Sequence, residues 1–193
     1  MKNKHLAVTL VTAGLLTFAS SALAQTDSPD SKRSGSASRM KSEGAANPDH
    51  TFMMKAAQGG MAEVELGQLA KDKASSDAVK TFGQHMIDDH SKANDELKDL
   101  ASKKNVTLPA DVDAKDRTTK DRLSKLSGEA FDRAYMRDMV ADHRKDIAEF
   151  EREANNGKDP DVKAWAAKTL PTLQNHLKMA EDTERQIAGG KTK

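Results

Sequence analysis

Residues 82–101 have the sequence FGQHMIDDHSKANDELKDLA, and residues 135–154 have the related sequence YMRDMVADHRKDIAEFEREA. Apolar residues recur in both stretches every three or four positions, which is the spacing of one face of an α-helix rather than of a strand. Each stretch also has an Asp-His pair that closely follows a methionine of this face. We interpret them as amphipathic helices with equivalent places around one core, or as two helices that share only a heptad pattern.

The same apolar spacing extends on both sides of these stretches, and capping residues mark the ends of four helices. Pro48 and Pro160 each follow an N-cap residue and precede an aspartate, an arrangement that suits the first turn of a helix. The expected helices cover residues 48–73, 76–105, 128–156 and 159–188. Because each of them has one apolar face that must be covered, the sequence predicts an all-α fold, a four-helix bundle.

The connections between these helices predict the topology. The first two helices have a tight link, and so do the last two, so each pair should form an antiparallel hairpin. About twenty residues separate the second helix from the third, and they include a short helix expected near residues 116–126. Such a connection is long enough to cross the bundle, as in ferritin-like folds. An up-down bundle with an elaborated loop is the alternative.

The first 24 residues have the pattern of a signal peptide. Two lysines precede an apolar run, and Ala22-Leu23-Ala24 is a site that signal peptidase accepts, so we expect cleavage before Gln25. The apolar run is shorter than the ~20 residues of an ordinary membrane span, and an uncleaved anchor is the alternative. Residues 25–47 are rich in Ser, Gly and charge, which predicts a flexible linker. Residues 48–190 would then form the bundle domain.

Composition and motifs exclude several classes of function. The 31 basic and 30 acidic residues are interspersed, so we expect neither nucleic-acid binding nor a membrane span in the mature chain. The chain has no cysteine, which excludes disulfides, thiolate metal sites and a lipid anchor at a cysteine. It also lacks a nucleophile elbow, a glycine-rich phosphate loop and a His-Glu-x-x-His motif. We therefore expect a non-enzymatic protein of the periplasm or envelope, stress-related or structural, whose partner is an envelope protein or a second copy of the chain.

Four polar residues interrupt the apolar faces near the middles of the four helices. They are Glu63, His90, His143 and His176, one on each helix. Helices packed side by side would bring these residues to a similar depth, and this is how bundle cores build metal sites. One carboxylate and three imidazoles suit copper, zinc or iron.

The neighbours of these residues leave several interpretations open. Asp89 and Asp142 could be further ligands or could orient a histidine, and the thioethers of Met86 and Met139 favour copper. The alternative to a metal is a buried hydrogen-bond network that fixes the register of the helices. A redox enzyme built on a metal centre is a third hypothesis, but this ligand set is poor in carboxylates.

Four segments of the chain resemble a known family, the bacterial secreted domain of unknown function 4142 (DUF4142). They are AAQGGMAEVELGQLA (56–70), MIDDHSKAN (86–94), LSGEAFDRAYMRDMVADH (126–143) and KTLPTLQNHL (168–177). The resemblance implies an exported, ferritin-like bundle and supplies no established activity. Di-iron members of the ferritin-like group have Glu-x-x-His on two helices. In this chain the position three residues before each of the three histidines is occupied by Ile87, Val140 or Leu173 instead of Glu. Ferroxidase or iron-storage chemistry is therefore not expected.

Overall fold

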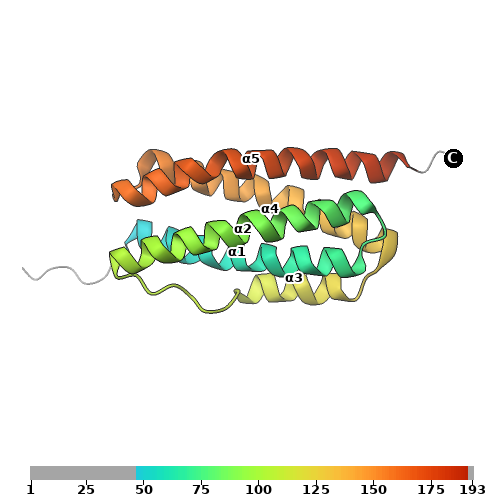
Figure 1. Cartoon of the computed structure of the whole chain (residues 1–193), viewed down its shortest axis with the longest axis horizontal. Helices are drawn as coiled ribbons and strands as arrows, with labels where there is room; N and C mark the ends of the chain where they lie inside the picture. The colour runs from blue at the N-terminus through green and yellow to red at the C-terminus, as the bar shows by residue number, and fades with distance from the viewer. Residues whose placement is uncertain (1–46, 191–193) are drawn as a thin grey trace, which may run out of the picture. The chain divides into compact units, whose positions relative to one another are not determined.

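The protein, analysed as a computed structural model, is described over residues 47–190, where all of its regular structure is helical (Figure 1). The helices are α1 (Pro48–Lys73), α2 (Asp77–Lys104), α3 (Ala114–Ser124), α4 (Gly128–Asn156) and α5 (Pro160–Gly189). The predicted all-α class is confirmed, and each predicted end of the four long helices lies within one residue of the observed end. The short helix α3 begins two residues earlier than expected. The expected signal peptide and nearly all of the expected linker lie outside the described residues.

The four long helices form two antiparallel hairpins joined by a crossover. Helix α1 pairs with α2, and α4 pairs with α5. The start of α4 lies at the α1–α2 turn, where Asp132 bonds to Ser75. The end of α2 lies at the opposite end of the bundle, where Lys104 pairs with Asp159 before α5. Residues 105–127 therefore run the length of the bundle, with α3 against α1, and the predicted long crossover is confirmed.

A buried aspartate from each hairpin holds the turn of the other hairpin. Asp132, near the start of α4, accepts hydrogen bonds from the backbone N–H groups of Ser75 (3.1 Å) and Ser76 (3.0 Å) in the α1–α2 turn. Asp49, in the first turn of α1, accepts the N–H groups of Lys158 (3.0 Å) and Asp159 (2.7 Å) in the α4–α5 turn. Hydrogen bonds to a buried charge are among the stronger ones in proteins, so these contacts fix how the hairpins slide along each other.

The core consists of two apolar clusters with a polar layer between them, which is formed by the buried side chains of Glu63, His90, His143 and His176. One cluster contains Phe82 and Tyr135, and the other contains Phe52, Phe150 and Trp165. On α5, His176 lies between the two clusters, because Leu173 belongs to the second cluster and Ala180 belongs to the first. None of the described helices combines the length and the apolar character that a membrane crossing requires.

Helices α1 and α2 come into backbone contact at two glycines. A Cβ atom on Gly67 would lie 2.6 Å from the carbonyl oxygen of Gly83, and one on Gly83 would lie 2.8 Å from the carbonyl oxygen of Gly67. Both distances are shorter than a van der Waals contact, so this approach of the helices requires residues without side chains. A Cβ atom on Gly59, on the same helix α1, would instead have open space around it.

The two glycines of α1 should therefore respond in opposite directions to alanine. Gly67→Ala should lower the free energy of unfolding by about 1–3 kcal/mol, because the backbone of α2 must move. Gly59→Ala should raise it by about 0.5–1 kcal/mol through helix propensity alone. Urea unfolding followed by circular dichroism measures both, and equal effects of the two substitutions would contradict the close approach.

Candidate metal centre

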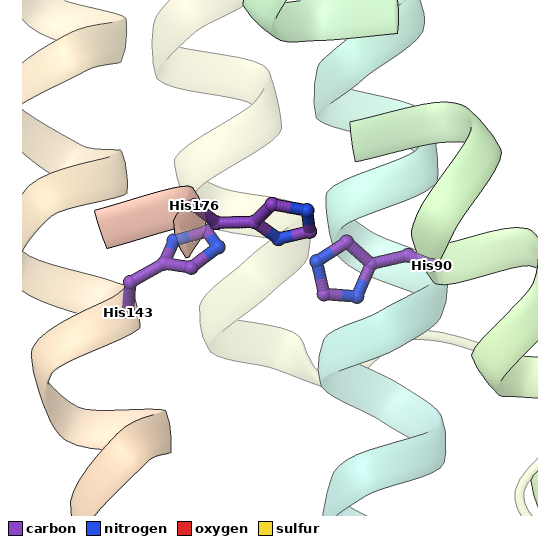
Figure 2. A group of neighbouring side chains, drawn as sticks. All are labelled: His90, His143 and His176. Atoms are coloured by element: carbon purple, nitrogen blue, oxygen red, sulfur yellow. The ribbon is translucent and has the colours of Figure 1, made fainter. Parts of the chain in front are cut away.

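Three buried histidines from three helices meet in the polar layer of the bundle. His90 on α2, His143 on α4 and His176 on α5 turn their rings toward one another (Figure 2). The ring centroids are 6.0 Å (His90 to His143), 5.2 Å (His90 to His176) and 5.4 Å (His143 to His176) apart. Each ring offers one nitrogen, and these three atoms lie within 4.8 Å of one another. The three histidines that the sequence singled out are therefore brought together.

The partners of His143 and His176 decide which nitrogen of each ring carries a free lone pair. His143 Nδ1 lies 2.9 Å from the carbonyl oxygen of Met139, which can only accept, so Nδ1 carries the proton. His176 Nε2 donates in the same way to Asp89 Oδ2 at 2.8 Å. His143 Nε2 and His176 Nδ1 are then bare acceptors, and both are buried without a hydrogen-bond partner among residues 47–190. Metal-binding histidines have this arrangement, with one nitrogen anchored and the other presented.

Glu63 on α1 completes the layer, so that each of the four long helices contributes one residue. Its side chain is 1% exposed, with Oε2 2.5 Å from His90 Nε2 and Oε1 3.3 Å from His143 Nδ1. Burial would raise the pKa of Glu63, but the imidazoles of His143 and His90 outweigh burial and lower this pKa to about 2. The contact with Glu63 also raises the pKa of His90 in spite of its burial. Without a metal, the pair therefore shares a proton that a metal ion can replace.

His176 on α5 is neutral at physiological pH. Burial lowers the pKa of His176 to about 4, although the hydrogen bond to Asp89 opposes this shift. A neutral imidazole is the form that binds a metal ion, because its lone pair is free. Asp89 thus acts on His176 as the orienting acceptor that the sequence analysis left open.

Two further carboxylates lie beside Glu63. The carboxylate oxygens of Glu63, Asp142 and Asp146 lie within 4.8 Å of one another. Burial and the charge of Glu63 raise the pKa of Asp142, and together with Asp142 they raise the pKa of Asp146 to about 8. The sequence analysis missed Asp146, although its place one turn after Asp142 on the same helix could have indicated it.

A cavity of about 290 Å³ adjoins this layer between α1 and α4. Glu63 and His90 form part of its wall, and its rim includes the exposed side chains of Lys115 and Lys145. The polar layer is therefore within reach of small solutes from one side.

The methionines of the sequence-based hypothesis pack elsewhere. The side chains of Met86 and Met139 belong to the apolar cluster around Phe82, and only the backbone carbonyl of Met139 contacts a histidine ring at hydrogen-bond distance. We therefore leave both thioethers out of the candidate ligand set.

Comparisons with known proteins match the chain to a domain family without an assigned function. A family model described as "Domain of unknown function (DUF4142)" matches residues 34–183, which confirms the predicted family. The fold is similar to a DUF305 fragment from Deinococcus radiodurans, at 13% identity over 74% of this chain and 98% of that chain, with a TM-score of 0.65. It is also similar to the putative secreted protein DUF305 from Streptomyces coelicolor, at 11% identity over 74% and 93% of the two chains, with a TM-score of 0.64. At these identities the likeness shows a shared fold, and no curated protein matches the chain.

Asp146 should make the stability of the metal-free protein depend on pH. The pKa of Asp146 is about 8 in the folded protein and has its ordinary value near 4 when unfolded, so stability falls as the pH rises through this window. Asp146→Asn removes this cost, and it should stabilise the protein by about 1–3 kcal/mol at pH 8.5 and by much less at pH 4.5. Urea unfolding with a chelator present measures the difference.

Asp138→Asn is the matched control, because Asp138 pairs with Arg122 at the surface of the same helix. Its effect should be small at both pH values. An equal gain from Asp146→Asn at pH 4.5 and pH 8.5 would show that neither burial nor the neighbouring carboxylates raise the pKa of Asp146 in the folded protein.

Proposed function

The chain belongs to the DUF4142 family, and we propose that it binds a divalent transition metal ion through His90, His143, His176 and Glu63. The observation that carries this proposal is the pair of buried imidazole nitrogens, His143 Nε2 and His176 Nδ1, that have no hydrogen-bond partner in the described part of the chain and lie beside the contact between His90 and Glu63. A buried polar atom without a partner costs free energy, so a purely structural network would pair these atoms with each other or with donors. A metal ion would accept both free lone pairs and replace the proton that His90 and Glu63 share.

The donor set supports zinc or copper(II). Imidazole nitrogen with one carboxylate oxygen suits these borderline ions, whereas calcium and magnesium require oxygen ligands. A tetrahedral zinc ion with bonds of ~2.1 Å holds its ligand atoms ~3.4 Å apart. The three imidazole nitrogens lie within 4.8 Å of one another, so small side-chain rotations would bring them to that separation. Copper(I) would gain from sulfur ligands, and the candidate set without Met86 and Met139 has none.

The number of ligands supports a binding protein rather than an enzyme. Four protein ligands complete a tetrahedral shell, which is typical of structural sites, whereas catalytic zinc keeps one position for water or substrate. The signal-peptide pattern of residues 1–24 supports export to the periplasm, and a similar solved structure is described as a putative secreted protein. We therefore propose a periplasmic, non-enzymatic metal-binding bundle, with an envelope protein or a second copy of the chain as its partner.

The metal content of the protein tests this proposal directly. Protein purified without chelators should contain close to one zinc or copper ion per chain by elemental mass spectrometry, and His143→Gln and His176→Gln should lose it. After chelation, adding the ion at 100 times its dissociation constant should stabilise the wild type by about 2.7 kcal/mol. The same addition should leave both variants unchanged.

His85→Gln is the matched control, because His85 lies on the exposed face of α2, five residues before His90. It should keep the full metal content and the full stabilisation. A wild type that contains no metal and is not stabilised by zinc, copper or iron would leave the histidines as a structural hydrogen-bond network.

A further inference from the structure

We propose a second cation site next to the imidazole centre, formed by the carboxylates of Glu63, Asp142 and Asp146, which takes a hard divalent ion such as Mn²⁺. The site uses only oxygen ligands, and it does not require a metal ion at the imidazoles. It goes beyond the proposed function, because it gives the bundle a second ion of a different chemical class.

The geometry comes from two neighbouring helices. Asp142 and Asp146 are one turn apart on α4 and so lie on the same side of that helix, and Glu63 approaches them from α1. The three carboxylates each offer one oxygen, and these oxygens lie within 4.8 Å of one another. Convergent carboxylates are the ligands that Mn²⁺ and Mg²⁺ prefer.

Glu63 provides an independent reason to expect a cation. Its carboxylate is almost fully buried, and neither of its oxygens accepts a hydrogen bond from a backbone N–H or a hydroxyl group within residues 47–190. The imidazoles of His90 and His143 face it from the inner side, while Asp142 and Asp146 lie close to it as well. The one proton that Glu63 shares with His90 cannot neutralise three neighbouring carboxylates, so a cation among them would lower the cost of burying Glu63.

The lysines nearby do not supply that charge. Lys115 Nζ lies 3.8 Å from Asp142, and Lys145 Nζ lies 3.8 Å from Asp146. Their side chains are 65% and 55% exposed, so both ammonium groups are hydrated at the rim of the cavity. Ion pairs between such exposed groups contribute little, so they offset little of the repulsion among the three carboxylates.

The adjoining cavity offers room and an entry path for a partly hydrated ion. All three carboxylates line this cavity of about 290 Å³. Gly59 and Gly60 form part of its wall on α1 and place no side chain in it, and Asp113 and Asp116 bring further negative charge from the crossover. Ions such as Mn²⁺ and Mg²⁺ keep several water ligands in protein sites, and a cavity of this size can hold those waters.

Titration with Mn²⁺ alone, followed by the loss of the free-ion signal in electron paramagnetic resonance, tests the second site. Chelator-treated wild-type protein should bind one Mn²⁺ per chain. Asp142→Asn and Asp146→Asn should each weaken this binding by about tenfold or more. Both variants should keep their helical circular dichroism and their zinc or copper content, because the imidazoles are unchanged.

Two further variants separate this proposal from the proposed function. Glu149→Gln is the matched control, since Glu149 lines the same cavity but lies outside the group of three, and it should leave Mn²⁺ affinity unchanged. His176→Gln should lose zinc or copper and keep Mn²⁺. The second site is overturned if wild type binds no Mn²⁺, if Asp146→Asn binds it as well as wild type does, or if His176→Gln abolishes it.

Discussion

The buried carboxylate of Glu63 is the constraint on which the middle of the bundle depends. A carboxylate taken out of water costs several kcal/mol unless charged or hydrogen-bonded partners surround it. Here the partners come from α2 and α4, through His90 and His143, and apolar clusters close the layer at both ends. The helices must therefore pack at one particular depth, because a shift of one turn would take the imidazoles of His90 and His143 away from the carboxylate.

The crossover and the two aspartate contacts set that depth. The crossover makes α2 and α4 parallel, so their related Asp-His pairs arrive at the same level of the bundle. Asp132 and Asp49 then tie each hairpin to the turn of the other through backbone hydrogen bonds. Because both ends are held, the level at which the imidazoles meet is also fixed by contacts outside the polar layer. Such preorganisation favours a specific ion geometry over a loosely coupled hydrogen-bond network.

Local signals in the sequence predicted the helices, their ends and the meeting of four residues, because periodicity and capping act within a few residues. The remaining features depend on contacts between distant segments. Asp132 resembles an ordinary acidic residue near a helix start, and its role appears only when the α1–α2 turn lies against it. Asp146 lies among many charged residues, and its inward direction follows from the rotation of α4. The lone pair that His176 presents is decided by Asp89, which is 87 residues away.

The internal repeat explains why one half of the polar layer is rich in nitrogen and the other in oxygen. Parallel helices α2 and α4 place their aspartates against different neighbours, so Asp89 faces α5 while Asp142 faces α1. The residue met on α5 is a histidine, and the residue met on α1 is a glutamate. One turn further along, α4 has Asp146 where the equivalent position of α2 has Ala93. Two differences within a near-symmetric frame thus make one half a group of three imidazoles and the other a group of three carboxylates, which select different ions by ligand softness.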